Sequence, residues 1–230
     1  MISARTLSFR DPALLPIWDK VKAGERLSLE DGLTLYNSPD LIGVGRMANE
    51  VARAKSGDSV YFVLNRKLEP TNVCVLSCKF CDFAVKAGAD DAYEMTLEDM
   101  LSKLRPDLHE VHITAGLHPT WPWEFYIDMV KTIKTRFPNV DVKAFTAVEI
   151  DYFSKKFKKS HEQVLQELQE AGLRTMPGGG AEVFSERVRK LLFKQKIGAK
   201  TWFDVHKQAH RMGINSNVTL LYGHVETLQE

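Results

Sequence analysis

The sequence predicts an α/β fold, namely a partial TIM-type parallel barrel that is truncated after its fifth strand and follows an N-terminal helical cap. Strand-like apolar segments alternate with helix-like segments from about residue 57 onward. Before that point, the apolar residues have only the spacing of helices. No sixth strand–helix unit follows the fifth strand. We therefore expect two domains, a helical cap over residues 1–56 and a barrel core over residues 57–230 that lacks its C-terminal part.

The helical cap is predicted from capping residues and apolar spacing. Ser28 and Asp31 have the spacing of a capping box, in which each side chain bonds to the other's backbone N–H. Ser38 precedes an apolar stripe with the period of one helix face, and we expect it to begin the next helix. The stripe consists of Leu41, Val44, Met47 and Val51.

Five strands and their connecting helices are predicted in the core. Each predicted strand is short, apolar and bounded by turn or capping residues. The strands are residues 60–64, 109–115, 140–147, 173–176 and 214–222. Predicted helices begin at Thr96, near Phe125 and at Ser160, and two more cover residues 182–193 and 201–212. In such barrels the chemistry lies at the carboxyl ends of the strands.

Composition excludes several classes of partner. Thirty-one basic and thirty acidic residues give a net charge of +1, so we expect neither nucleic acid nor an anionic membrane as a partner. The first twenty residues lack the apolar core of a signal peptide, and no run reaches membrane-spanning length. The sequence therefore predicts a cytoplasmic protein.

An odd count of three cysteines in a reducing compartment favours metal or redox chemistry over a disulfide framework.

The cysteines follow the first predicted strand in the pattern C-x3-C-x2-C, at Cys74, Cys78 and Cys81. Three thiolates can bind three irons of a four-iron cluster, which leaves the fourth iron open to a ligand from elsewhere. The alternative is a structural zinc module in which a histidine completes the set. His109, His112 and His118 are the candidates for that ligand.

Five further stretches carry a resemblance to a known family. Pro-Thr-Asn-Val-Cys occupies residues 70–74, Ala-Gly-Leu-His-Pro residues 115–119, and Lys-Ala-Phe-Thr-Ala-Val-Glu residues 143–149. Pro-Gly-Gly-Gly-Ala-Glu occupies residues 177–182 and Leu-Tyr-Gly-His-Val-Glu residues 221–226. With the cysteine loop, these stretches resemble the aminodeoxyfutalosine synthases, which are radical S-adenosylmethionine (SAM) enzymes. Alanine at 115 and lysine at 67 depart from the family's more frequent glycine and histidine.

The resemblance implies the cofactors and the reaction. It implies a [4Fe–4S] cluster on Cys74, Cys78 and Cys81, with SAM bound to the open iron and consumed as a cosubstrate. The 5′-deoxyadenosyl radical of this family adds to 3-[(1-carboxyvinyl)oxy]benzoate and gives 6-amino-6-deoxyfutalosine, an intermediate of menaquinone biosynthesis. The electron comes from a donor such as flavodoxin or ferredoxin. Dehypoxanthine futalosine cyclase and the deazaflavin-forming FO synthase share the cysteine loop and remain alternatives.

Five residues are candidates for cofactor binding. The resemblance implies that Phe80 lies against adenine, and that Ala115 and Gly116 present backbone carbonyls to the amino group of SAM. Glu182 follows three glycines, where a carboxylate can accept hydrogen bonds from ribose, although a helix-start role is the alternative. Asn217 belongs to an alternating set with Asn215 and Thr219 that we expect to face the barrel interior; in the opposite register, Ser216 and Val218 would face inward.

Three residues are candidates for catalysis. Glu149 follows the third strand and is either a substrate ligand or a helix cap. His118 and His224 lie in strand–helix loops at the same end of the predicted barrel, where an imidazole can donate a proton or contact substrate.

Overall fold

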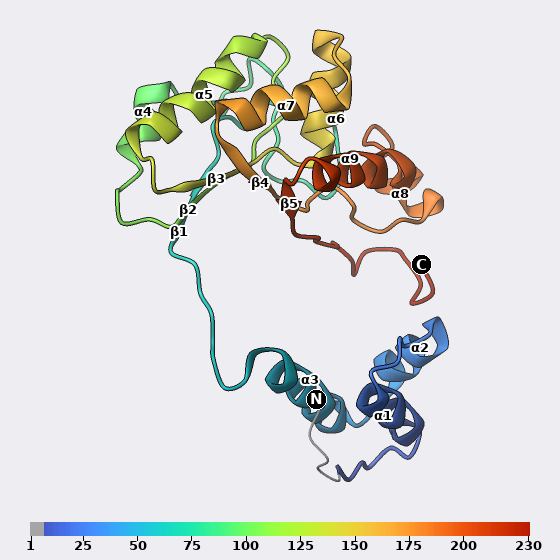
Figure 1. Ribbon diagram of the computed structural model, residues 1–230. Coiled ribbons are helices and arrows are strands. Elements are labelled where there is room, and N and C mark those ends of the chain that lie inside the picture. Colours follow the sequence, from blue (N-terminus) through green and yellow to red (C-terminus); the bar gives the residue numbers. More distant parts are fainter. Residues whose placement is uncertain (1–6) are drawn as a thin grey trace. The chain divides into compact units, whose positions relative to one another are not determined.

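A computed structural model of the chain describes residues 7–230, which form two compact units (Figure 1). One unit contains the described residues up to Phe62 together with Thr227–Glu230, and the other is Val63–Glu226. The predicted limit at residue 56 coincides with the end of the third helix, whereas the units divide after Phe62.

The first unit contains three helices, α1 (Leu14–Ala23), α2 (Leu29–Asn37) and α3 (Leu41–Ser56). Ser28 forms the predicted capping box with Asp31. The prediction for Ser38 was wrong, because Asp40 caps α3 by accepting a hydrogen bond from the Gly43 backbone N–H. Ser38 instead ends α2. The small core of this unit consists of Leu14, Trp18 and Met47.

The second unit contains a five-stranded parallel sheet in the order β1-β2-β3-β4-β5, as a partial barrel requires. The predicted first strand was wrong: residues 60–64 are exposed, and the strand lies directly after them. That strand has only one buried residue, Leu68, so the apolar run before it gave the stronger but misleading signal. The strands are β1 (Asn65–Leu68), β2 (Glu110–Ile113), β3 (Asp141–Ala144), β4 (Leu173–Met176) and β5 (Asn215–Ser216).

The helices of the second unit lie along one face of the sheet (Figure 1). Apolar residues from the strands and these helices form one continuous core. The helices are α4 (Leu97–Ser102), α5 (Trp123–Arg136), α6 (Ala147–Phe157), α7 (His161–Ala171), α8 (Glu186–Leu192) and α9 (Ala199–Arg211). The third strand ends at Ala144, short of the predicted residue 147, and α6 begins at Ala147; the sequence indicated this helix only through the possible capping role of Glu149.

The fifth strand is shorter than predicted, but its register is informative. The Ser216 hydroxyl lies 3.0 Å from His206 Nδ1 and 2.9 Å from His210 Nε2, both on α9. Ser216 therefore faces the helices, and Asn215 lies on the opposite face of the sheet, here called the inner face. This agrees with the favoured register at Asn215, whereas Asn217 and Thr219 lie beyond the end of β5.

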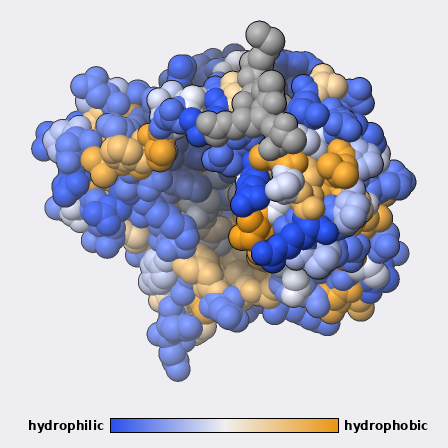
Figure 2. Space-filling view, turned by 90° about the horizontal axis from the view of Figure 1, so that it is seen from below, coloured by the Kyte–Doolittle hydropathy of each residue, from blue (hydrophilic) through white to orange (hydrophobic). Residues whose placement is uncertain are grey.

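Within residues 7–230, the structure has no helix with the length and apolar character needed to cross a lipid bilayer. The view in Figure 2 shows a mostly hydrophilic surface with separate hydrophobic patches.

Candidate active site in the cysteine pocket

The three cysteines line one cavity of about 180 Å³ at the carboxyl ends of the strands. Cys74 is buried, whereas Cys78 and Cys81 are half-buried. Burial raises the pKa of the Cys78 thiol, and the other two thiols are near enough to raise it further. The cavity is also lined by Leu76, Phe80, Phe83, Ala84, Thr114, Ala115, Gly116, Leu117, Thr146, Val148, Glu149, Gly180 and Lys196.

Backbone hydrogen bonds attach the cysteine loop to the sheet. Cys74 N–H donates to the Val85 carbonyl at 2.9 Å, and Val75 N–H donates to the Leu117 carbonyl at 3.0 Å. Gly116 makes this approach possible, because a Cβ at that position would lie 2.2 Å from the Val73 carbonyl oxygen. A glycine is therefore required where the loop crosses the end of β2.

Lys86 is a site residue that the sequence analysis missed. Its ammonium donates to three successive carbonyls of the cysteine loop: Cys74 at 3.1 Å, Val75 at 3.1 Å and Leu76 at 2.6 Å. A lysine ammonium has three donors, so one side chain satisfies three carbonyls that point the same way. Lys86 therefore holds the turn between the first two cysteines.

We expect Lys86→Met to loosen this turn and to accelerate loss of a bound cluster to a chelator about tenfold, the lower end of the effect of outer-shell changes. Hydrogen exchange in the cluster-free protein should also speed up at the loop amides. Lys79→Met is the matched control, because it removes a lysine charge from the same loop without removing these three bonds. Equal behaviour of the two variants would contradict the role of Lys86.

A second bracing segment follows α8. Lys79 N–H donates to the Leu192 carbonyl at 2.8 Å, and Ser77 N–H donates to Gln195 Oε1 at 2.8 Å. The last residue of α8 and the segment after it thus support the cysteine loop on another side. Gln195 carries no recognisable sequence signal, because its partner is 118 residues away in the chain.

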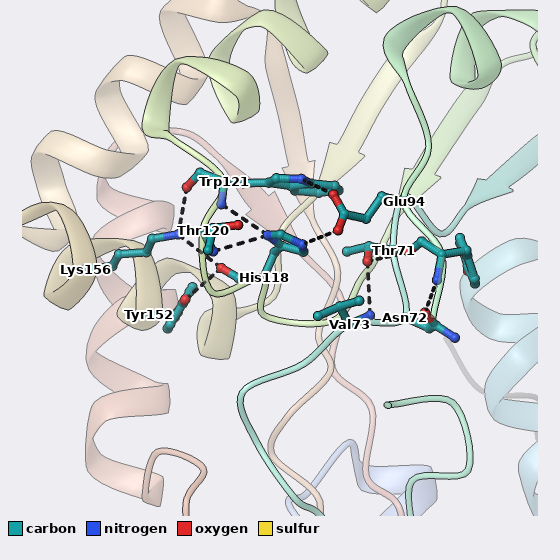
Figure 3. Close-up of polar contacts among 10 residues, drawn as sticks. Thr71, Asn72, Val73, Glu94, His118, Thr120, Trp121, Tyr152 and Lys156 are labelled. Atoms are coloured by element: carbon teal, nitrogen blue, oxygen red, sulfur yellow. Dashed lines mark hydrogen bonds and ion pairs between the residues drawn. The ribbon is translucent and has the colours of Figure 1, made fainter. Parts of the chain in front are cut away.

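His118 lies outside the cavity lining, in a buried polar cluster (Figure 3). Its Nδ1 accepts hydrogen bonds from the Thr120 and Trp121 backbone N–H groups at 3.3 and 3.1 Å, and its Nε2 lies 3.0 Å from Glu94 Oε1. The ring stacks on Trp121. These contacts join the segment before α4 to the loop after β2, and the predicted catalytic role of His118 stays a prediction.

Glu149 lies in the cavity lining, where it is almost completely buried. Its carboxylate accepts hydrogen bonds from the Thr146 backbone N–H at 2.7 Å and the Thr146 hydroxyl at 2.8 Å, which makes it the capping-box partner of α6. Burial raises its pKa to about 7, against the lowering effect of these bonds. The helix-cap interpretation is confirmed, and the position of Glu149 in the cavity lining is compatible with the predicted role as a substrate ligand, which stays a prediction.

Phe80, Lys196 and Glu182 form a connected group. Phe80 lines the cavity, and the Lys196 ammonium lies 5.1 Å from its ring centre. Lys196 is ion-paired with Glu182, which is buried and has a left-handed backbone with φ of 48°. Such a conformation is uncommon outside glycine and is found disproportionately at ligand sites. Lys196 was not predicted from the sequence.

The last two candidates lie after β5. The Asn217 carbonyl oxygen packs so closely on Gly178 that a Cβ there would lie 1.8 Å away, which accounts for one of the three glycines. Asn217 itself is exposed and outside the cavity lining. The exposed His224 ring lies against Phe80, with 5.7 Å between the ring centres.

The fold and the pocket together define a class of protein. Within residues 7–230, no three His, Cys, Asp or Glu side chains converge as ligands of a single metal ion. Thiolates of a four-iron cluster bind different irons, so three cysteines around a cavity fit a cluster better than a single ion. The class is that of α/β barrels with an iron–sulfur cluster on the first strand–helix loop.

Comparison with known proteins places the chain within that class. The family model described as "Radical SAM superfamily" matches residues 68–230. The chain therefore belongs to this superfamily. Its members use a [4Fe–4S] cluster and SAM. The fold agrees with that of methylornithine synthase, whose crystal structure superposes with a TM-score of 0.71 at 19% sequence identity. The match covers 93% of this chain and 61% of the methylornithine synthase chain.

Relatives of known name are more similar in sequence. Over 96% of the present chain, the sequence is 45% identical to "Aminodeoxyfutalosine synthase" of Thermus thermophilus. Over 90% of the present chain, it is 42% identical to the protein of the same name from Streptomyces coelicolor. It is 36% identical to "FO synthase" of Mycobacterium leprae over 84%. The chain spans 60%, 54% and 23% of the lengths of these three relatives.

Proposed function

We propose that the chain forms the cluster-bearing part of an aminodeoxyfutalosine synthase. This enzyme would join the adenosyl group of SAM to 3-[(1-carboxyvinyl)oxy]benzoate, release methionine, lose the enolpyruvyl carboxylate as carbon dioxide, and give 6-amino-6-deoxyfutalosine for menaquinone biosynthesis. The observation that carries the proposal is the 45% identity to a relative of that name over 96% of this chain. A reduced flavodoxin or ferredoxin would supply the electron.

The pocket supports the assignment of roles. Cys74, Cys78 and Cys81 would hold three irons of the cluster, since they line one cavity on a loop that is braced on two sides. When bound, the cluster and SAM supply an adenosyl radical, which is chemistry that the protein itself cannot provide.

The remaining pocket residues would orient SAM and exclude water. Ala115 and Gly116 border the cavity with backbone that can approach a ligand closely, and Phe80 offers an aromatic face for adenine. Glu182 would accept hydrogen bonds from ribose, held in position by Lys196. Glu149, with its pKa near 7, can donate or accept a proton at the cavity wall.

The second candidate is an FO synthase-like reaction, which is favoured by the 36% identity to an FO synthase. Such an enzyme uses the adenosyl radical to abstract hydrogen rather than to form the product. The two candidate reactions therefore differ in which molecule contains the adenosyl carbons after turnover, the main product or 5′-deoxyadenosine.

The test is anaerobic turnover of the complete protein with reductant, carbon-13-labelled SAM and the enolpyruvyl benzoate. We expect the label chiefly in a product that also contains the benzoate ring, with 5′-deoxyadenosine as a minor species. Recovery of the label chiefly as 5′-deoxyadenosine, with the benzoate unchanged, would refute the synthase assignment and support the second candidate.

A further inference from the structure

A row of polar side chains crosses the sheet one level below the cysteine pocket. The strand register pairs Lys67 with His112, His112 with Lys143, Lys143 with Thr175, and Thr175 with Asn215. One residue from each strand thus stands at the same level, although the five positions are distributed over the whole chain. We call these five residues the polar row.

The polar row lies on the inner face of the sheet. The neighbours of His112 along β2 are Val111 and Ile113, and both are fully buried in the core between sheet and helices. Val142 and Ala144 flank Lys143 in the same way. Because side chains alternate along a strand, the row faces away from the helices.

Two side chains of the polar row have polar atoms that form no hydrogen bond with any described residue. His112 Nε2 and Thr175 Oγ1 are buried, and neither has a partner within residues 7–230. Buried polar atoms in folded proteins are nearly always paired, so unpaired ones indicate a missing ligand or water. Two of them in one row mark a place where a polar group is expected.

The charges of the row favour an anion. Lys143 is largely buried, and its ion-pair partner Glu110 lies 3.8 Å away, beyond hydrogen-bond distance. Lys67 pairs with Glu69 in an exposed position, where such pairs contribute little. Burial and the two lysines lower the pKa of His112, which favours the uncharged ring, so His112 offers a hydrogen bond.

The row is placed to hold one end of a ligand that reaches the cysteine pocket. Thr114 lines that pocket and follows His112 by two residues on the same face of β2. Two residues of strand span about 7 Å. A substituted benzoate can extend over that distance, with its ring carboxylate at the row and its side chain in the pocket.

We propose that the polar row binds a carboxylate of the substrate, with Lys143 supplying the charge and His112 and Thr175 supplying hydrogen bonds. For the identity of the ligand, this inference rests on the proposed function. It adds the residues that recognise the benzoate end of the substrate.

The test measures binding rather than turnover. The probes are 3-(1-carboxyethoxy)benzoate, in which the substrate's double bond is saturated, and 2-phenoxypropanoate, which lacks the ring carboxylate. The complete protein, loaded with cluster and SAM, should bind the first probe about 10- to 100-fold more tightly, as expected for a charge-assisted hydrogen bond. In Lys143→Met the two probes should bind with similar affinity.

Two controls isolate the contact. Lys143→Arg should keep most of the difference between the probes, because it keeps the charge. Lys200→Met, at an exposed lysine of α9, should leave the difference unchanged. If Lys143→Met distinguishes the probes as well as the unmodified protein does, the polar row is not the carboxylate site. If the unmodified protein binds SAM but neither probe, the proposed substrate is wrong, and the inference falls with it.

Discussion

Cys74→Ala, Cys78→Ala and Cys81→Ala are each expected to abolish turnover and to prevent stable assembly of the cluster. All three cysteines of this chain line the pocket, so each variant removes one of the three thiols gathered around the cavity. A four-iron cluster with only two protein ligands cannot keep its geometry in this pocket. The loss of activity should exceed about 100-fold, the upper limit for changes beyond the direct ligands.

Iron and sulfide content per chain after anaerobic reconstitution measures the effect directly. Ser77→Ala is the matched control, because it shortens a side chain between Cys74 and Cys78 while leaving the Ser77 backbone bond to Gln195 in place. A cysteine variant with full iron content and full turnover would show that the thiol in question is not a ligand.

Gly116→Ala is expected to have the second largest effect. The added methyl group would lie 2.2 Å from the Val73 carbonyl oxygen, which belongs to backbone and cannot rotate away. The cysteine loop would have to move off the end of β2, at a cost of about 1–3 kcal/mol in the free energy of unfolding. This movement would also strain the backbone hydrogen bonds that Cys74 and Val75 donate to the Val85 and Leu117 carbonyls.

Cluster retention and chemical unfolding measure this prediction together. Gly45→Ala is the control: Gly45 lies within α3, and a Cβ there meets no atom within 4 Å. That change should stabilise its helix by about 0.5–1 kcal/mol without changing iron content. Unaltered stability and iron content in Gly116→Ala would mean that the loop does not depend on its close approach to β2.

The parts of the fold that the sequence predicted correctly are those with strong local signals. Capping boxes at Ser28, Thr96 and Ser160 mark three helix starts, and the structure has all three. The fourth strand, residues 173–176, lies between a helix-ending glycine and a glycine run, and its bounds were predicted correctly. Cysteine spacing, with the resemblance to a family, led to the correct superfamily.

The errors occurred where tertiary contacts override local pattern. Strand β1 is polar apart from Leu68 and its other three residues are exposed, so the exposed apolar run before it carries the stronger strand signal. Lys86, Gln195 and Lys196 were missed, since their roles depend on how loops pack and not on periodicity. For His118, the place in a loop after a strand predicted chemistry, whereas the structure shows the ring outside the cavity lining and bonded to the Trp121 backbone and Glu94; its catalytic role stays a prediction.

The central claim is that the pocket holds a four-iron cluster with one iron open to SAM. Electron paramagnetic resonance of the reconstituted and reduced complete protein, recorded with and without SAM, tests it most directly. We expect about four irons and four sulfides per chain and a spectrum that changes when SAM is added. A protein that holds stoichiometric zinc instead, or a cluster whose spectrum SAM leaves unchanged, would contradict the account.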